Sequence, residues 1–204
     1  FRRQLFYLRR FRKRFLTMLI NQIINIEEDF DSGGVTEPVT LLQVKEYLRL
    51  NGFGSEDSGE QEFDYDDVLI ESMITEARMW VEKYTGRFIV AREITVVLLN
   101  QAGYIRLPGP VAGTIVIKDD NGDTIVAEDY EVIGTSFPKI ETKFSNRISA
   151  TYDVGYSTFP KWVENSIMAY IADHYEYRGD DLPPAPNERA AQIARPYREV
   201  QSWG

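Results

Sequence analysis

The sequence contains no cysteine and a single histidine, His174. The lack of cysteine excludes disulfides and thiol chemistry, and it removes the commonest ligand of structural zinc. One histidine is too few for a multi-histidine metal centre, and no run approaches the ~18 apolar residues that span a bilayer. We therefore expect no cofactor, no metal and no membrane partner.

Motifs that carry catalysis or phosphate binding are also missing. The chain has no Walker loop, no G-x-G-x-x-G, no G-x-S-x-G and no H-E-x-x-H. The segment Asp119–Asp123, DDNGD, resembles the start of a calcium loop, but its glycine is misplaced and no glutamate closes the frame. His174 has no nucleophile beside it, which favours a packed or surface side chain. The sequence predicts no enzyme and no catalytic residue.

Charge is unevenly distributed along the chain. Seven of the 23 basic residues lie in residues 1–17, which hold no acid, so residues 18–204 carry 16 basic against 32 acidic residues. Such an acidic body repels phosphate, because nucleic-acid binding depends on clustered Lys and Arg. The basic opening has three interpretations: an arm that folds on an acidic partner or on nucleic acid, a membrane-surface helix, or upstream sequence before a start at Met18.

The folded part is expected to begin after the polar, Gly-rich linker at 29–34. Thr40, with Gln43 three residues later, predicts a capping box that opens a helix over 41–50. Asn51-Gly52 is predicted to end this helix. The helix is expected to bury three aliphatic residues: Leu41, Val44 and Leu48.

Two longer helices are predicted from apolar residues at helical spacing. The first runs over 65–84, with Gly86 as its left-handed cap, and the second begins at Pro160. Aromatic residues on such a stripe belong to the core more often than to a ligand pocket, since apolar periodicity is the commoner cause. The residues predicted to fill the core scaffold are Leu69, Met73, Ala77, Trp80, Tyr84, Ile167 and Ile171.

Between the two longer helices the apolar period changes to two, which is typical of strands. Asn121-Gly122 is the strongest hairpin signal and predicts a type I′ turn. Pro108 and Pro110 mark a bend or a sheet edge. The chain is therefore predicted to be α+β: a mainly helical scaffold of three or four helices, with a small antiparallel β block inserted between the second and last long helices.

After the last long helix, a Pro-rich link, LPPAPNE, leads into the final segment of the chain. A short helix is predicted over 188–194, broken at Pro196. The apolar content of this tail is too small for a core of its own. We expect it to dock, either on a partner or on its own domain.

Five short motifs occur along the chain in a fixed order: PVTL opening the first helix, YTGR closing the second, YDVGY leaving the sheet, a proline starting the last helix and HYEYR ending it. In this order they resemble the tailed-phage head–tail connector (neck adaptor) family. The resemblance covers about residues 36–179 and fails in 1–35 and in the acidic loop 52–64. It implies an N-terminal extension over 1–35, basic at 1–17, a connector domain over 36–179 and a Pro-linked docking tail over 180–204.

The resemblance implies a structural virion protein, made in the bacterial cytoplasm and located in the neck of a phage or prophage particle. Such proteins form a ring of about twelve copies under the portal, extend the DNA channel and dock tail or stopper proteins. DNA is expected to pass without specific binding, because a basic wall would brake it. The family's C-terminal segment commonly reaches the portal, which implies these contact residues: Arg189, Ile193, Tyr197, Arg198 and Trp203.

Two other functions stay open at this point. One is a host-derived α+β binding module whose basic arm at 1–17 recruits an acidic partner or nucleic acid. The other is an enzyme that uses acidic residues around 52–64. That enzyme needs a metal or a perturbed carboxylate, and the sequence reveals neither.

Overall fold

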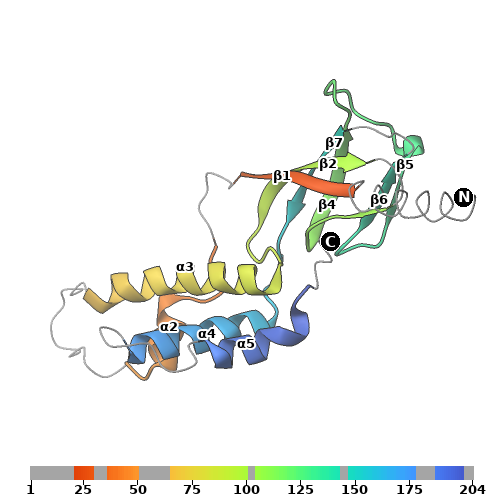
Figure 1. Ribbon diagram of the computed structural model, residues 1–204. Helices are drawn as coiled ribbons and strands as arrows, with labels where there is room; N and C mark the ends of the chain where they lie inside the picture. The colour runs from red at the N-terminus through yellow and green to blue at the C-terminus, as the bar shows by residue number, and fades with distance from the viewer. Residues whose placement is uncertain are drawn as a thin grey trace, which may run out of the picture. The chain divides into compact units, whose positions relative to one another are not determined.

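The computed structural model describes residues 21–29, 36–50, 65–100, 104–142, 147–177 and 187–199. The chain divides into two compact units (Figure 1). The β unit takes residues 1–34, 91–155 and 202–204, and the helical unit takes 35–90 and 156–201. The basic segment 1–17, the loop 52–64 and Trp203 lie outside the described residues, so the predictions about them stay predictions.

The described residues of the helical unit form four helices: α2 (Leu41–Tyr47), α3 (Tyr65–Thr85), α4 (Lys161–Glu176) and α5 (Glu188–Ala194), followed by a 3-10 turn at Arg195–Tyr197. Figure 1 shows α3 as one layer and α2, α4 and α5 as a second layer. Helix α4 packs against each of the other three. The chain leaves this unit and re-enters it at adjacent points, because the Tyr156 N–H donates to the Ile89 carbonyl at 3.0 Å.

Helix α2 begins with the predicted capping box. The Thr40 hydroxyl accepts from the Gln43 N–H at 3.2 Å, and the Gln43 side-chain oxygen accepts from the Thr40 N–H at 2.8 Å. The helix ends at Tyr47, earlier than predicted, because Arg49 adopts a left-handed φ of 59°. Val44 is fully buried, whereas Leu41 and Leu48 are partly buried against the same core.

The buried face of α3 consists of residues at three- and four-residue spacing: Ile70, Met73, Ile74, Ala77 and Val81. Leu69 and Trp80 are partly buried and pack against this core. Tyr84 is half-buried and stacks on Trp80, with ring centroids 5.0 Å apart, so this aromatic pair lies at the edge of the stripe. Gly86 has a φ of 68° and its N–H donates to the Glu82 carbonyl, which confirms the predicted left-handed cap.

Helix α4 begins after Pro160, which is its N-cap residue, and buries Ile167 and Ile171 completely. The buried Tyr170 donates its hydroxyl to the Glu76 carboxylate at 2.9 Å, and burial raises the pKa of this tyrosine. His174 stacks on the Tyr170 ring at 4.0 Å, and its Nδ1 lies 2.9 Å from the Tyr170 carbonyl oxygen. The histidine is therefore a packed side chain.

The β unit holds two antiparallel sheets within the described residues, which confirms the α+β class. The first sheet has the order β1 (Asn21–Asp29), β2 (Arg92–Asn100), β7 (Arg147–Val154) and β4 (Val111–Lys118). The second has the order β3 (Ile105–Arg106), β6 (Lys139–Thr142) and β5 (Tyr130–Ile133), and a 3-10 turn at Ala127–Asp129 precedes β5. Every second residue of β2 and β7 is buried, including Ile94, Val96, Leu98, Ile148, Ala150, Tyr152 and Val154.

Strand β1 shows that the predicted start of the folded part was wrong. Asn21–Asp29 pairs antiparallel with β2, from Asn21 opposite Asn100 to Asp29 opposite Glu93. The partner strand lies beyond two helices along the chain, so no hairpin signal reveals the pairing. The functional division at residues 35 and 179 stays a prediction.

The predicted hairpin at Asn121-Gly122 forms, but its turn is not type I′. A type I′ turn needs positive φ at both central residues; here Gly122 has a φ of 91°, whereas Asn121 lacks a positive φ. The Asp119 carboxylate holds a different turn, because its Oδ1 accepts from the Asn121 and Asp123 N–H groups, both at 2.9 Å. The bond from the Asp123 backbone is also the main cause that lowers the pKa of Asp119.

Pro108 and Pro110 lie in a buried bend between β3 and β4, which belong to different sheets, so the predicted bend is confirmed. The Tyr152 hydroxyl donates to the Pro108 carbonyl at 3.1 Å, and burial raises the pKa of that tyrosine. A Cβ on Gly109 would lie 2.3 Å from the backbone oxygen of Ser136, so only glycine fits there.

Candidate assembly surface on the helical unit

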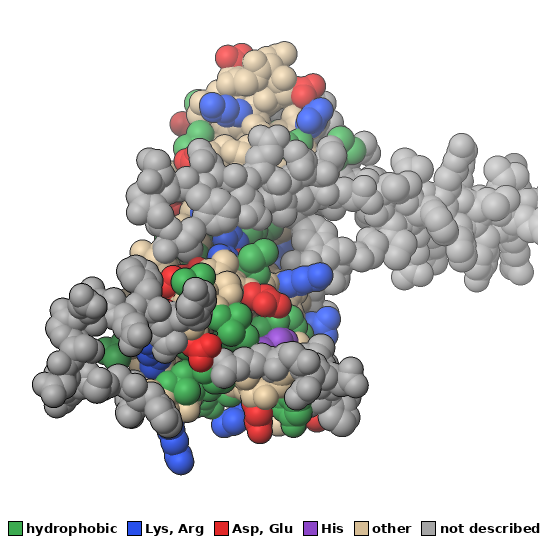
Figure 2. Space-filling view, turned by 90° about the vertical axis from the view of Figure 1, so that its left-hand side faces the viewer, with side chains coloured by type: hydrophobic (Ala, Val, Ile, Leu, Met, Phe, Trp, Pro, Cys, Tyr) green, Lys and Arg blue, Asp and Glu red, His purple; other side chains and the backbone are tan. Residues whose placement is uncertain are grey.

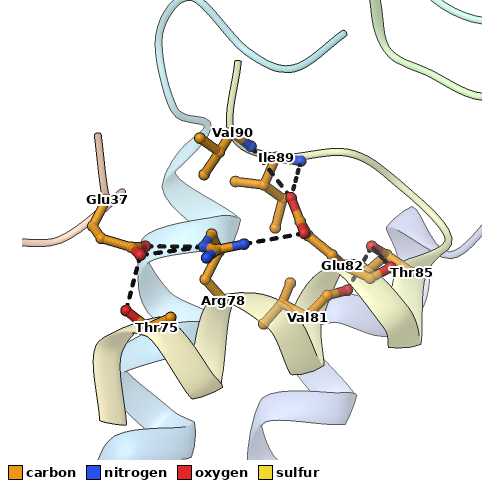
Figure 3. A network of polar contacts seen from close by, with 8 residues as sticks. All are labelled: Glu37, Thr75, Arg78, Val81, Glu82, Thr85, Ile89 and Val90. Atoms are coloured by element: carbon orange, nitrogen blue, oxygen red, sulfur yellow. Dashed lines mark hydrogen bonds and ion pairs between the residues drawn. The ribbon is translucent and has the colours of Figure 1, made fainter. Parts of the chain in front are cut away.

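A charged network fixes the segment that follows α3 (Figure 3). Arg78 Nε lies 3.1 Å from a Glu37 oxygen, and its guanidinium also lies 3.3 Å from Glu82 Oε2. The other Glu82 oxygen accepts from the backbone N–H groups of Ile89 at 2.8 Å and Val90 at 3.3 Å. One carboxylate therefore satisfies two buried backbone donors where the chain leaves the helical unit.

Arg87, the arginine of the YTGR motif, anchors the C-terminal segment on the helical unit. Its Nε donates to the Tyr197 carbonyl at 2.6 Å, and its terminal nitrogen lies 2.7 Å from Glu199 Oε1. The Glu199 N–H donates to the Thr85 carbonyl at 2.7 Å. Of the two predicted docking modes, the tail thus docks on its own unit, and YTGR is its anchor as well as a helix end.

Aromatic contacts add to this anchor. Trp162 and Tyr197 stack with ring centroids 4.4 Å apart, and the Arg198 guanidinium lies 5.5 Å from the centre of the Tyr84 ring. Tyr197 and Arg198 nevertheless stay exposed. The tail is tied down while its side chains still reach the surface.

A groove of about 600 Å³ lies on the helical unit, with its floor on α4 and its walls on α2 and α5. Each helix contributes side chains at helical spacing, because residues three and four apart share one face. The residues that define this helical groove include Glu46, Tyr47, Asn165, Met168, Arg189 and Ile193. Figure 2 shows hydrophobic side chains reaching the surface of the helical unit among charged side chains of both signs.

The structure divides the five predicted tail residues into separate places. Arg189 and Ile193 line the helical groove, Tyr197 stacks on Trp162 at the start of α4, and Arg198 lies over Tyr84 at the end of α3. Trp203 is outside the described residues. Sequence reasoning missed the contributions of α2 and α4 to the groove. In the sequence, each of these helices shows only a short row of polar residues. Such a row is also typical of a solvent-exposed helix face, so it does not indicate a groove until the packing of the helices is known.

A second groove, of about 420 Å³, lies on the β unit. Strands β4 and β5 line it, and each is an edge strand of its sheet. A bulge interrupts the pairing of β4 between Ala112 and Val116, and Val132 of β5 is exposed in the groove. Bulges and short strands are common protections of a sheet edge, so this groove needs no partner to explain it.

Within the part of the chain that the structure describes, no three His, Cys, Asp or Glu side chains gather as metal ligands would. No helix there is long and apolar enough to cross a bilayer. The arrangement on the helical unit is one of packing surfaces and of salt bridges that hold backbone in place. Its chemistry is that of a contact surface.

The chain matches no protein-family model and no curated protein. Its fold matches chains of gene transfer agent (GTA) particles. A chain from the neck of an empty GTA particle, computed with C6 symmetry, superposes with a TM-score of 0.64 at 20% identity and covers 87% of this chain and 97% of that chain. A chain from the virion of a native GTA particle has a TM-score of 0.60 at 19% identity, with coverage of 89% and 96%.

A chain from the neck of a native GTA particle, computed with C12 symmetry, has a TM-score of 0.56 at 17% identity and covers 82% of this chain and 96% of that chain. All three likenesses extend over most of both chains. They confirm the resemblance to head–tail connector proteins at the level of the fold.

Proposed function

We propose that this protein is a head–tail connector, a structural ring component in the neck of a phage or prophage particle. The observation that carries the proposal is the fold shared with GTA neck chains over 87% of this chain and 97% of the other. The groove and the exposed tail residues of the helical unit suit a subunit that contacts other proteins in an assembly. We assign the protein no enzymatic role.

The ring is proposed to hold about twelve identical copies, joined by heterologous contacts that close a circle. The C6 and C12 symmetries of the GTA neck structures support a cyclic arrangement. In the particle this ring would lie under the portal, extend the DNA channel and give tail or stopper proteins a platform. The protein would be made in the bacterial cytoplasm before it joins the virion.

The charge of the chain suits a channel wall. The formal net charge is −9, and residues 18–204 hold twice as many acidic as basic residues. DNA carries a dense row of phosphates, so a wall of this sign repels the duplex and lets it slide. We therefore propose that DNA passes without specific binding.

The portal contact is proposed for the end of the tail. Of the five tail residues, Tyr197, Arg198 and Trp203 keep this role in the proposal, whereas Arg189 and Ile193 lie in the helical groove. Tyr197 and Arg198 are exposed although they contact Trp162 and Tyr84. A partner that offers an aromatic or acidic surface would replace these contacts with similar ones.

The test is reconstitution with the portal protein of the same particle, followed by analytical ultracentrifugation and electron microscopy. We expect the chain to co-sediment with the portal and to appear as a ring beneath it. A chain that stays monomeric at high concentration and does not associate with the portal would refute the proposal. Salt-sensitive DNA binding that disappears when residues 1–17 are removed would favour the host binding module instead.

A further inference from the structure

The outward face of α3 carries an exposed ridge. Val68 is 63% exposed and Met79 is 57% exposed, and the two lie three helical turns apart on the same side of the helix. Met79 is ~200° around the helix from the fully buried Ala77. Helix α3 packs its buried face on α2, α4 and α5, and Val68 and Met79 lie on the opposite side of the helix.

The helical groove lies in the other layer of the same unit, which α2, α4 and α5 form (Figure 1). Its apolar side chains are Tyr47, Met168 and Ile193, one from each helix. A ridge on one layer and a groove on the other are two different patches on one body. Such a pair makes head-to-tail contacts between copies, the kind that closes a ring.

The charges of the two patches are complementary. Glu76 and Lys83 lie on either side of Met79 along α3, ~10 Å apart, and Glu76 is exposed although one of its oxygens accepts the Tyr170 hydroxyl. In the groove, Glu46 on α2 and Arg189 on α5 flank the apolar side chains, and neither makes an ion pair with another described residue. Along the ridge, an acid, a methionine and a base follow one another. The groove has a base, an apolar floor and an acid, so the charges of the two patches can pair.

We propose that the α3 ridge of one copy docks in the helical groove of the next copy and forms the copy-to-copy contact of the ring. Met79 fills the space over Met168, since an unbranched thioether adapts to an irregular apolar pocket. Glu76 pairs with Arg189 and Lys83 with Glu46. This inference rests on the proposed ring function, and it assigns Arg189 and Ile193 to the neighbouring copy.

The absence of cysteine from the chain makes a clean cross-linking test possible. One variant carries both Met79→Cys and Asn165→Cys, because Asn165 is an exposed residue of the groove floor. The protein is assembled with its portal, oxidised and run on a non-reducing gel. We expect a ladder of covalent oligomers up to the ring size.

Single variants distinguish a head-to-tail contact from other arrangements. Met79→Cys mixed with Asn165→Cys should give only a dimer, because each chain then supplies one half of the bond. Leu42→Cys with Asn165→Cys is the matched control, since Leu42 is 62% exposed on the same unit and does not line the groove. This control should give no ladder.

A second variant measures the contribution of the ridge. Met79→Glu places a charge against the apolar floor, and we expect its assembly to need at least about a hundredfold more protein than wild type. Leu42→Glu should assemble as wild type does. Circular dichroism of both variants checks that they fold.

The outcomes separate this inference from the function on which it rests. Rings that form without a Met79–Asn165 ladder, or a groove cysteine that cross-links only to the portal, would overturn the inference and leave the ring intact. No ring in the wild-type reconstitution would overturn the proposed function and the inference with it.

Discussion

Replacing Glu82 with alanine is the sharpest test of how the helical unit is held together. The substitution removes the acceptor for two backbone N–H groups, at Ile89 and Val90, which belong to residues that are almost completely buried. It also removes one of the two carboxylates that face Arg78, while Glu37 remains. Each buried donor left without an acceptor costs roughly 1–3 kcal/mol.

The expected loss is about 3 kcal/mol in the free energy of unfolding. It lies in the lower half of the summed range of about 2–6 kcal/mol for the two donors, because the Glu82 carboxylate is 13% exposed and water reaches part of the site. Urea unfolding followed by tryptophan fluorescence measures the loss, since Trp80 and Trp162 both belong to the helical unit. With a slope of about 2 kcal/mol per molar urea, the midpoint falls by about 1.5 M.

Two variants make this result interpretable. Glu82→Gln keeps a side-chain acceptor for the backbone and loses only the charge opposite Arg78, so it should cost about 1 kcal/mol. Glu71→Ala removes an exposed acid from the same helix and should stay within about 0.5 kcal/mol of wild type. If Glu82→Ala lost no more stability than Glu71→Ala, the carboxylate would not be holding the segment.

The other predictions concern the tail and the β unit. Arg87→Met should speed hydrogen exchange at residues 195–199 by at least about tenfold, and unchanged exchange would contradict its anchoring role. Gly109→Ala should cost the β unit about 1–3 kcal/mol in urea unfolding, because its Cβ would meet a backbone oxygen at 2.3 Å; wild-type stability would contradict this clash. Because the pKa of Asp119 is lowered in the folded protein, its carboxylate stabilises the fold at pH values above the unfolded-state pKa. This stabilisation is lost as pH falls through the folded-state pKa. An NMR titration should place the Asp119 midpoint below that of an aspartate in a model peptide. Equal midpoints would contradict the hydrogen bonds from the turn backbone to the Asp119 carboxylate.

Features with a local cause could be predicted from the sequence. The capping box at Thr40 and the left-handed Gly86 depend on residues within one turn of each other, so their spacing is visible in the sequence. The lengths of α3 and α4 follow from apolar residues that recur over many turns. The short helix over 188–194 was also predicted correctly, since Pro196 limits it.

Features that depend on distant partners could not be predicted. Strand β1 pairs with β2 across the whole first half of the helical unit, and the role of Glu82 depends on where the backbone of Ile89 passes after the helix. The type I′ turn predicted from Asn121-Gly122 was wrong, because hydrogen bonds to the Asp119 side chain stabilise a different turn. The helical groove is lined by short polar rows from three helices. It could not be predicted from any one of these rows, because it forms only where α2 and α5 pack on α4.

The hydrogen bond between Tyr156 and Ile89 has a consequence for how such a chain evolves. The chain leaves and re-enters the helical unit at these two neighbouring residues. The packing of the helices therefore does not depend on the length of the chain between Ile89 and Tyr156. Turns in the β unit can lengthen or shorten without stretching a single helical contact. The loops of the β unit can therefore vary during evolution while the helical unit, to which we assign the copy-to-copy contact of the proposed ring, keeps its packing.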